Sequence, residues 1–407
     1  MASQREINPM SSFSRQITQD FKAIERPLRV QILIFTFIRL VFNTLYRMVY
    51  PFLPVFSRGL GVDISTLSLA LTNRYLVGML GPFLAAIANR HGRKVGMLFG
   101  VGMFIAGVII MVIWPSFPAF VIMLILTTLG KYGFDPSMQA YLGDRIPYQR
   151  RGLPISITEL GWSLSFFLGI PLISFLIARR GWTSPFLILA LLGCVAGFVL
   201  LWLVPRDTVS NEGQTNLLGN FREVLSYPPA LAGLFVGLSG SVANEVINLI
   251  FGVWMEDSFG LMIIALGGTA AVIGLAELGG ETLVGGLVDR IGKESAVRAG
   301  LITNCFAALI FPLVGNSAAG AVMALFLFFI TFEFMLVSSI PMMTEMMPGA
   351  RATLMSFNVA GLSLGRAIGA LIGPSLFAWG IGASAGAAII FNLLAILALR
   401  WVREAVD

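Results

Sequence analysis

Apolar residues gather into twelve long runs along the chain, and short polar stretches separate one run from the next. The runs lie at residues 30–56, 64–88, 95–113, 118–142, 153–178, 184–204, 230–255, 263–288, 295–314, 320–346, 353–378 and 384–402. A membrane-crossing α-helix needs about 20 predominantly apolar residues, so each run is long enough to span a bilayer. The pattern predicts an all-α membrane protein with 12 transmembrane helices.

Two polar stretches differ from the short connections. Residues 1–29 are polar and mixed in charge, and they lack the short apolar core of a removable signal peptide. Residues 205–228 form the one long polar stretch between two apolar runs, and we expect a cytoplasmic linker that is partly helical along the membrane surface. This linker separates an N-terminal half, residues 30–204, from a C-terminal half, residues 229–407, with six predicted helices each.

The composition agrees with a surface that faces lipid. Of the 407 residues, 57% are hydrophobic and 12% are charged, whereas about 25% are charged in an average soluble domain. So few ionic side chains cannot cover a water-facing surface. The 44 glycines and 32 phenylalanines are typical of helices that pack closely inside a bilayer. The twelve runs leave no room for a large soluble domain.

The distribution of Lys and Arg predicts the orientation. If the N-terminus is cytoplasmic, 19 basic residues fall in cytoplasmic segments: Arg5, Arg15, Lys22, Arg26, Arg29, Arg90, Arg93, Lys94, Arg145, Arg150, Arg151, Arg206, Arg222, Arg290, Lys293, Arg298, Arg351, Arg400 and Arg403. Only Arg58, Arg179 and Arg180 fall in the opposite segments. Because cytoplasmic loops carry the excess of basic residues, we expect both termini on the cytoplasmic side of a plasma (inner) membrane. The net charge of +6 therefore reflects membrane topology and not nucleic-acid binding.

Several classes of chemistry are excluded by residues that the chain lacks. His91 is the only histidine, and Cys194 and Cys305 lie in separate apolar runs, so we expect no disulfide. Zinc, haem and iron–sulfur sites need clustered His or Cys ligands, and nucleophilic catalysis would depend on His91 alone. No phosphate-binding P-loop is present. We expect no metal, no cofactor, no ATP hydrolysis and no enzymatic activity.

Two loop pairs reveal an internal repeat. The segment at 85–94, AAIANRHGRK, matches the segment at 285–294, GGLVDRIGKE, and each follows the second helix of its half. Asn89, Arg90, Gly92 and Arg93 thereby correspond to Asp289, Arg290, Gly292 and Lys293. The segments at 143–152 and 344–353 correspond in the same way after the fourth helix of each half. Two loop pairs at nearly one offset indicate a duplicated six-helix unit.

These loops resemble the signature of the major facilitator superfamily, Gly-x-x-x-Asp-Arg/Lys-x-Gly-Arg/Lys-Arg/Lys. The second half has the pattern at Gly285, Asp289, Arg290, Gly292 and Lys293, whereas Ala85 and Asn89 replace its Gly and Asp in the first half. An Asp-Arg-x-Pro pattern at Asp144, Arg145 and Pro147 is also similar to the family. The resemblance implies two pseudo-symmetric halves and identifies the superfamily without identifying a member.

The loop also has a physical interpretation. Gly92 and Gly292 permit a tight reversal of the chain, and basic side chains there face anionic lipid headgroups. The resemblance implies that the loop latches the two halves together on the cytoplasmic side. Because Asn89 carries no charge, we expect the first-half latch to be the weaker one. The alternative is that Arg93 and Lys94 only fix the topology.

Ionisable side chains inside the predicted helices are the candidate functional residues, because they are costly in a membrane. They are Arg39, Arg47, Arg74, Lys131, Asp135, Glu159, Glu245, Glu277, Glu281, Glu333 and Arg366. The resemblance implies that helices 1, 4, 7 and 10 line the central cavity. The binding candidates on these helices, with their polar neighbours, are Arg39, Asn43, Tyr46, Arg47, Lys131, Asp135, Glu245, Asn248 and Glu333.

Helical spacing predicts how some of these charges pair. Lys131 and Asp135 lie at i, i+4, and Arg39 lies at the depth of Asp135 and Glu159 by the rise of 1.5 Å per residue. A structural ion-pair cluster is therefore the alternative to a binding role for these residues. Arg47 and Glu245 have no partner nearby in sequence, so we favour substrate or ion binding for both.

A buried carboxyl group without a partner tends to stay protonated, because desolvation disfavours its charge. Glu245, Glu333 and Glu277 are therefore the candidates for carrying a coupling proton. Glu277 shares a face of helix 8 with Glu281, and the alternative for these two is an interface between the halves.

Glycines mark close packing in helix 11, where Gly361, Gly365, Gly369 and Gly373 recur at every fourth position. Antiporters of the resembling family often carry a glycine-rich Gly-Pro motif in helix 5. Helix 5 of this chain has only Gly161, Gly169 and Pro171, which disfavours an assignment as a drug–proton antiporter.

The sequence therefore predicts a secondary active transporter that works by alternating access, with its site at the interface of the halves. The expected partners are a small organic solute, anionic or zwitterionic, the proton as coupling ion and the lipid bilayer, and we expect a monomer. The alternative within transport is an efflux antiporter or flippase for amphipathic drugs or lipids. A membrane-embedded enzyme or a receptor is the alternative from a different class.

Overall fold

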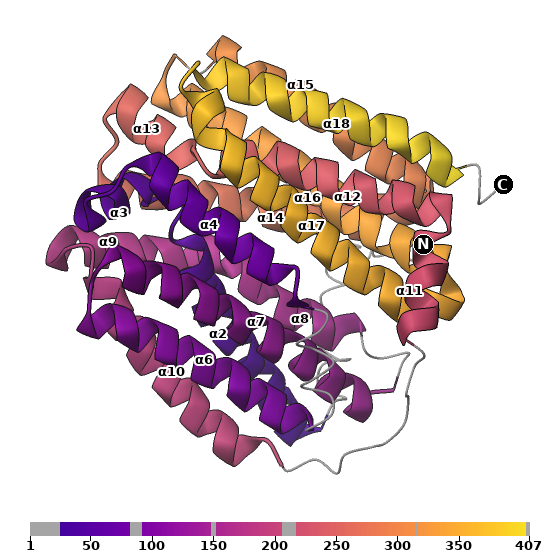
Figure 1. Cartoon of the computed structure of the whole chain (residues 1–407), viewed down its shortest axis with the longest axis horizontal. Coiled ribbons are helices and arrows are strands. Elements are labelled where there is room, and N and C mark those ends of the chain that lie inside the picture. The colour runs from indigo at the N-terminus through magenta and orange to yellow at the C-terminus, as the bar shows by residue number, and fades with distance from the viewer. Residues whose placement is uncertain (1–24, 82–91, 148–151, 206–216, 315, 404–407) are drawn as a thin grey trace, which may run out of the picture.

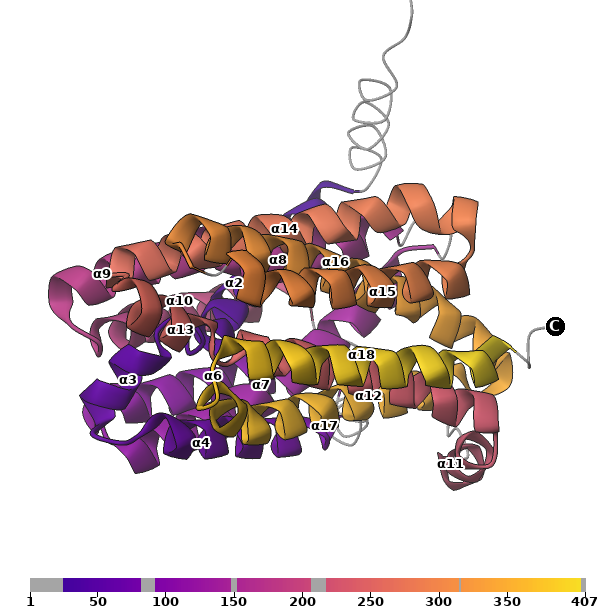
Figure 2. The same ribbon diagram turned by 90° about the horizontal axis from the view of Figure 1, so that it is seen from above.

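The computed structural model describes residues 25–81, 92–147, 152–205, 217–314 and 316–403. The N-terminal half contains α2 (Arg26–Arg47), α3 (Leu53–Leu60), α4 (Ile64–Gly78), α6 (Arg93–Ile113), α7 (Phe117–Arg145), α8 (Gly152–Leu164), the π turn η2 (Ser165–Gly169), α9 (Ile170–Arg180) and α10 (Ser184–Leu203). The C-terminal half contains α12 (Pro228–Asn248), α13 (Phe251–Phe259), α14 (Ile263–Ile291), α15 (Lys293–Val314), α16 (Ala318–Met346), the short η3 (Pro348–Ala350), α17 (Arg351–Phe377) and α18 (Ile381–Arg403). Between them lies α11 (Leu217–Leu225), which crosses one end of the bundle (Figures 1 and 2).

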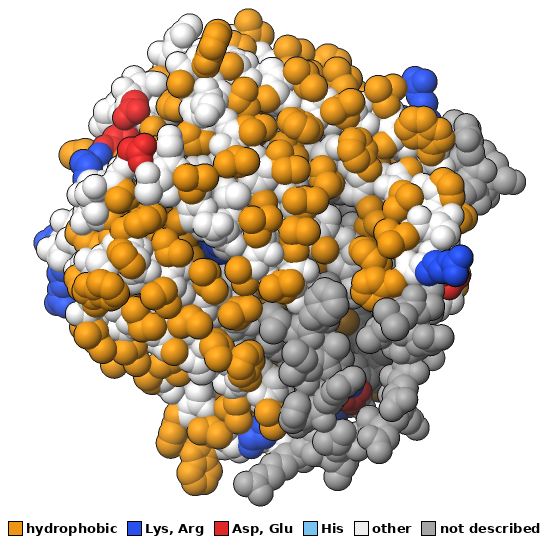
Figure 3. All heavy atoms as spheres, viewed as in Figure 1, with side chains coloured by type: hydrophobic (Ala, Val, Ile, Leu, Met, Phe, Trp, Pro, Cys, Tyr) orange, Lys and Arg blue, Asp and Glu red, His pale blue; other side chains and the backbone are white. Residues whose placement is uncertain are grey.

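The predicted all-α membrane fold is confirmed. Within the described residues, 11 helices are long and apolar enough to cross a membrane. The remaining expected span, 64–88, is described as far as Gly81, and its helix α4 ends at Gly78. Figure 3 shows hydrophobic side chains over most of the visible face, with charged side chains near its edges. Such a belt is the surface that a bilayer requires.

Helices 1 and 7 are broken, whereas the sequence predicted continuous helices at 30–56 and 230–255. In the first half α2 ends at Arg47 and α3 begins at Leu53, with Pro51 in the break. Proline lacks an N–H and disfavours helix in the residue before it. In the second half α12 ends at Asn248 and α13 begins at Phe251, although that break contains no proline. The backbone of Gly252 lies so close to the carbonyls of Tyr50 and Pro51 that no side chain would fit between them.

Two helix pairs hold the halves together. α4 packs against α17, and α8, η2 and α9 pack against α14. Ser68 of α4 donates a hydrogen bond to the carbonyl of Ala370 of α17. On α14, Gly274 lies against the backbone of Ser163 and Phe167. Both pairs bring segments from different halves of the sequence side by side (Figures 1 and 2).

The glycine stripe of the eleventh predicted span, which is α17 in the structure, serves close packing, as its spacing predicted. A Cβ atom on Gly365 would meet the carbonyl of Leu238, and one on Gly369 would meet Glu245 at 2.6 Å. Both contacts are with α12. The absence of side chains on this face therefore lets α17 lie against the backbone of α12.

The internal repeat is visible in local details of the backbone. Gly92 and Gly292 adopt φ angles of 95° and 84° where α6 and α15 begin, which L residues with side chains rarely adopt. Ser116 and Ser317 each accept a hydrogen bond from the amide three residues later at the start of α7 and α16. Asp63 caps α4 in the same manner, and its hydrogen bonds from Thr66 lower the pKa of its carboxyl group.

Candidate functional site

Arg47 and Glu277 form a buried ion pair between the two halves. Arg47 is the last residue of α2, and Glu277 lies near the middle of α14. Nη1 donates to Oε2 at 2.8 Å and Nη2 donates to Oε1 at 2.5 Å, and the two side chains are 3% and 4% exposed. Two parallel bonds fix the plane of the guanidinium as well as its position. The pair is therefore a specific link between halves and not a loose surface contact.

Two aromatic rings of helix 5, the span formed by α8, η2 and α9, lie close to the guanidinium of Arg47. Its Cζ lies 3.5 Å from the ring centre of Phe166 and 4.2 Å from that of Trp162. Nη1 also donates to the Trp162 carbonyl at 3.1 Å. That carbonyl lies where α8 passes into the π turn Ser165–Gly169, a helix irregularity that is frequent at functional sites. Helix 5 thus supplies two aromatic rings and one hydrogen-bond acceptor for the cation.

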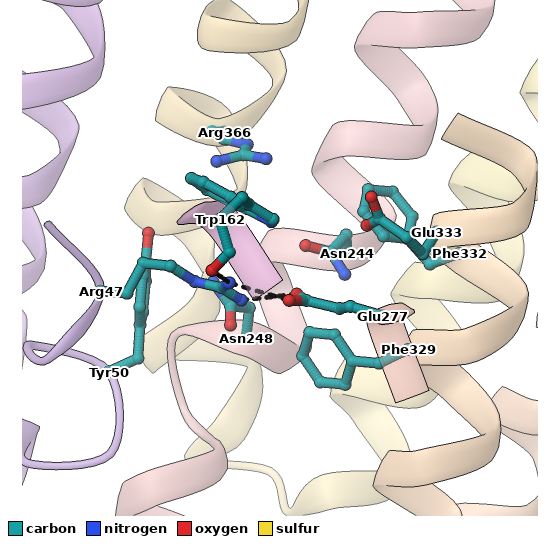
Figure 4. Close-up of a pocket in the computed structure, with 10 residues that line it drawn as sticks. All are labelled: Arg47, Tyr50, Trp162, Asn244, Asn248, Glu277, Phe329, Phe332, Glu333 and Arg366. Carbon is teal, nitrogen blue, oxygen red and sulfur yellow. Dashed lines mark hydrogen bonds and ion pairs between the residues drawn. The ribbon is translucent and has the colours of Figure 1, made fainter. Parts of the chain in front are cut away.

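A small pocket adjoins this ion pair. Its lining residues are Arg47, Tyr50, Trp162, Asn244, Asn248, Glu277, Phe329, Phe332, Glu333 and Arg366, and Figure 4 shows them around one space. The cavity measures about 10 Å³, which is room for about one water molecule. In this conformation the site therefore has charged walls but no space for an organic solute.

Two charged side chains of the pocket stand apart from the ion pair. Within the described residues, no hydrogen bond or ion pair reaches the carboxylate of Glu333, which is 5% exposed. The guanidinium of Arg366 makes no ion pair with any described carboxylate either, and its Cζ lies 5.6 Å from the ring centre of Trp162. Figure 4 shows the two side chains on different sides of the drawn group. The pocket thus contains one paired and one unpaired charge of each sign.

A second cluster lies beside the pocket and links Arg74 to Glu245 through tyrosine. Arg74 is fully buried and donates to the Tyr46 carbonyl at 2.8 Å, to the Tyr50 hydroxyl at 2.8 Å and to the Tyr75 hydroxyl at 3.0 Å. Tyr75 in turn donates to Glu245 Oε1 at 2.9 Å. Because Arg74 and Tyr75 lie on α4 and Glu245 lies on α12, this chain of hydrogen bonds also joins the halves.

A third cluster lies entirely within the N-terminal half. Arg39 contacts Asp135 at 3.2 Å and Glu159 at 2.7 Å. Lys131 contacts Asp135 at 2.7 Å and donates to Asn43 Oδ1 at 2.7 Å. The structure therefore contains the ion-pair cluster that the sequence left open as the alternative to a binding role, together with the i, i+4 pair of Lys131 and Asp135 that spacing predicted. This cluster uses the charges of these residues to tie α2, α7 and α8 together.

The structure divides the predicted site residues among these three groups. Arg47, Asn248, Glu277 and Glu333 line the pocket, Tyr46 and Glu245 belong to the tyrosine cluster, and Arg39, Asn43, Lys131 and Asp135 belong to the N-terminal cluster. The expected lining by helices 1, 7 and 10 is found. Helix 4 is absent from the lining among the described residues, because Lys131 turns toward Asn43 and Asp135.

Sequence reasoning did not select several residues of the site. Trp162, Asn244 and Phe329 line the pocket although the sequence did not select them, and Arg366 lines it although it was a candidate functional residue only and not one of the binding candidates. The sequence feature that pointed to Arg366 is its charge inside a span, because ionisable side chains are rare there. The structure agrees with the alternative that Glu277 and Glu281 lie at the interface, since Glu281 accepts a hydrogen bond from Ser163 of the other half at 2.8 Å. The proton-carrier role of Glu277 stays a prediction.

The gating-loop residues are described only in part. Asn89, Arg90 and the side chain of Asp289 lie outside the described residues, and Arg290 is exposed. Arg93 pairs with Asp144 at 3.1 Å, and Lys293 pairs with Glu345 at the equivalent place in the other half. Each of these ion pairs joins two residues of the same half, the first in the N-terminal half and the second in the C-terminal half. The predicted latch between the halves therefore stays a prediction. Cys194 and Cys305 are free, and no cluster of metal-ligating side chains occurs in the described residues.

Comparison with known proteins gives the chain a family. The model of the Major Facilitator Superfamily matches residues 35–344. An uncharacterized MFS-type transporter of Bacillus subtilis, YwfA, is 25% identical over 348 residues, which cover 82% of each chain. A protein of Proteus mirabilis named Multidrug resistance protein MdtG is 24% identical over 372 residues, covering 86% of this chain and 90% of the relative. The fold matches that of a D-xylose–proton symporter with a TM-score of 0.72 at 16% identity, covering 89% of this chain and 96% of the symporter.

Proposed function

The chain belongs to the Major Facilitator Superfamily, a family of multi-pass membrane transporters, and from this premise we propose a secondary active transporter that is coupled to protons. It moves a small organic solute through the pocket between Arg47, Glu277, Glu333 and Arg366 by alternating access. The transporter lies in the inner membrane as a monomer, with both termini in the cytoplasm. The Lys/Arg asymmetry of the sequence supports this orientation.

The Arg47–Glu277 pair is the observation that carries the proposal. It bridges the halves across a cavity of about 10 Å³, so a solute gains entry only when the halves move apart and the pair opens. Opening exposes two buried charges that were compensating each other, which is unfavourable unless a new partner or water replaces the lost one. A bound solute and a proton are such partners. Transport and opening are coupled in this way by electrostatics.

Glu333 is the proposed proton carrier. Glu277 is held by Arg47, and Glu245 accepts hydrogen bonds from Tyr75 at 2.9 Å and Asn248 at 3.3 Å. Glu333 has no such partner among the described residues, so it takes up a proton without breaking an existing bond. It faces the same cavity as Arg47 and Glu277. Its charge therefore influences whether Arg47 remains with Glu277.

The conformation of the bundle supports the same cycle. At the end that bears α3 and α13, Arg58 pairs with Glu256 at 2.5 Å, and Gly252 packs against the carbonyls of Tyr50 and Pro51. In the proposed orientation this end faces outward. The structure then corresponds to a state that is closed on the outside and occluded at the pocket. Loss of the α3–α13 contact would open the outward path.

An efflux antiporter for amphipathic drugs or lipids is the second candidate. The relatedness to proteins named for multidrug resistance favours it, and the phenylalanines of the pocket suit an apolar cargo. The two candidates differ in one measurable property. In a symporter the solute and the proton move in the same direction, whereas in an antiporter they move in opposite directions.

Reconstituted protein tests the proposal. Liposomes that contain a trapped pH-sensitive dye are exposed in turn to sugars, carboxylates, amines and lipophilic cations. We expect at least one class to move protons across the membrane in a protein-dependent manner, and the sign of the pH change distinguishes symport from antiport. A rate of solute movement that is the same with and without a pH gradient would contradict proton coupling. Conversion of a solute without translocation would favour a membrane-embedded enzyme.

A further inference from the structure

We infer that Arg366, with Trp162 beneath it, is the subsite that binds an anionic group of the solute, so that the cargo is a small organic anion. This inference rests on the proposed transport function and adds the chemical class of the solute. The sequence did not select Trp162, and it gave Arg366 only as an ionisable residue inside a span, without a binding role. The geometry of the pocket and the partners of the neighbouring charges carry the assignment.

The other intramembrane cations of the described helices already have partners. Arg39 and Lys131 bind carboxylates of the N-terminal half, and Arg47 binds Glu277. Arg74 donates to one carbonyl and two tyrosine hydroxyls. Arg366 alone among them has neither an ion pair nor a hydrogen bond to a described residue, although it lines the pocket. A guanidinium in a dry site is unfavourable without a counter-charge, so Arg366 is the cation that is free to bind one.

Nearby carboxylates do not fill this role. Glu277 gives both oxygens to Arg47, and Glu245 accepts bonds from Tyr75 and Asn248. Glu333 is free, but it projects from α16 on another side of the group in Figure 4 and makes no ion pair with Arg366. Glu245 acts on Arg366 electrostatically, but no described carboxylate makes a direct ion pair or hydrogen bond with the guanidinium. An anion in the pocket is positioned to supply that direct partner.

The surroundings of Arg366 suit an organic anion in particular. A guanidinium presents a planar fork that matches the two oxygens of a carboxylate or the oxygens of a phosphate. Trp162 lies 5.6 Å from the Arg366 Cζ and 4.2 Å from that of Arg47, so its ring holds both cations at the same pocket wall. Phe329 and Phe332 supply an apolar surface for the remainder of the solute. At this wall a lipophilic cation would meet the guanidinium of Arg366, which has no ion pair, and the neutralised guanidinium of Arg47 offers it no compensating attraction.

The packing of α17 around Arg366 supports a binding role for this side chain in addition to a packing role. Gly365 and Gly369 let α17 lie against the backbone of α12, and this close packing sets the direction in which the Arg366 side chain leaves the helix. On the adjoining turn, Ser363 and the Tyr132 hydroxyl lie 3.1 Å apart and join α17 to α7. The guanidinium is therefore presented to the cavity by a helix that is fixed on two sides.

Paired probes that differ only in charge test the inference. Purified full-length protein is heated in detergent with benzoate, phenylpropionate or hexanoate, and separately with the matched primary amides and with tetraphenylphosphonium. We expect the carboxylates to raise Tm and the amides and the cation to leave it unchanged. Arg366→Gln should abolish the shift, and Arg366→Lys should retain part of it. Arg298→Gln, which removes a guanidinium that pairs with Glu294 on the same helix, is the matched control and should behave as wild type.

Each outcome separates this inference from the proposed function. Equal stabilisation by amides and carboxylates, no stabilisation by any carboxylate, or an unchanged carboxylate effect in Arg366→Gln would overturn the anion subsite. If tetraphenylphosphonium then drives proton movement in liposomes, proton-coupled transport stands and only the solute class is wrong. Carboxylate binding that depends on Arg366 but moves no protons would instead sustain the subsite and contradict the coupling. Arg366→Lys guards against a folding defect, because it keeps the charge and most of the packing.

Discussion

Arg47 at the end of α2 and Glu277 in α14 lie 230 positions apart in sequence, yet they share two parallel hydrogen bonds of 2.8 and 2.5 Å. The rings of Trp162 and Phe166 lie over the guanidinium, 4.2 and 3.5 Å from its Cζ. The pair lines the pocket and connects the halves through a buried ion pair. Its geometry leads directly to a stability prediction.

Neutralising one member of this pair should destabilise the closed state. Glu277→Gln leaves Arg47 buried without a counter-charge, and the loss of one partner of a buried pair costs about 3–5 kcal/mol. We expect a clear fall in Tm in detergent, with partial recovery in the double variant Arg47→Gln/Glu277→Gln. Arg298→Gln serves as the control, since exposed helix pairs contribute only about 0.5 kcal/mol. Equal effects of Glu277→Gln and Arg298→Gln would show that the pair contributes nothing to closure.

Removing the shared carboxylate of the N-terminal cluster should affect folding and not solute recognition. Asp135 contacts both Arg39 and Lys131, so Asp135→Asn leaves two cations without this partner. We expect a lower Tm, because the cluster ties three helices of one half together, with an unchanged apparent affinity in binding assays on the folded fraction. A loss of affinity at an unchanged Tm would instead assign Asp135 to the binding site.

Two glycines of helix 11 provide a matched test of close packing. A Cβ atom on Gly365 would collide with the Leu238 carbonyl, whereas one on Gly361 would lie 3.6 Å from the nearest atom, the Leu234 carbonyl. Alanine is the better helix former by about 1 kcal/mol. Gly365→Ala should therefore lower Tm, and Gly361→Ala should leave it unchanged or raise it slightly. A similar fall in both variants would argue that the stripe acts through backbone flexibility.

We expect the contact between α3 and α13 to open during transport. Arg58→Cys and Glu256→Cys, in a background where Cys194 and Cys305 are replaced by Ser, place thiols on both sides of this contact. A short bifunctional thiol reagent should join them and stop solute exchange, and a cleavable version of the reagent should restore exchange after reduction. Exchange that continues in the cross-linked protein would mean that this end does not open. The single-cysteine variants treated with the same reagent are the controls.

The sequence predicted what depends on spacing along one helix or on repetition between halves. Runs of apolar residues located the helices, and the i, i+4 spacing of Lys131 and Asp135 predicted a pair that the structure contains. The positive φ angles of Gly92 and Gly292 agree with the tight reversals expected at the repeated loops. Each of these features is local, so a single segment of sequence is enough to indicate it.

Partners on different helices could not be found in this way. Which carboxylate meets Arg47 depends on the rotation of α2 and α14 about their axes and on how the halves dock, and neither follows from spacing. The break at Leu249 and Ile250 contains no proline that could have marked it in the sequence. It accompanies the contact of Gly252 with the other half, which sequence spacing does not reveal. Arg366 was recognised as an intramembrane charge, but it was not included among the binding candidates because helix 11 was not expected to line the cavity.

The most direct test of the account measures proton coupling in Glu333→Gln. Glutamine keeps the size and the hydrogen-bonding capacity of the side chain but cannot take up or release the proton. In liposomes, with the solute that moves protons through the wild-type protein, we predict that Glu333→Gln loses accumulation driven by a pH gradient and retains solute counterflow. Glu345→Gln is the matched control on the same helix, because its carboxylate pairs with Lys293 outside the pocket, and it should accumulate solute as wild type does. Accumulation by Glu333→Gln at the wild-type level would contradict the assignment of Glu333 as the proton carrier and with it the proposed coupling.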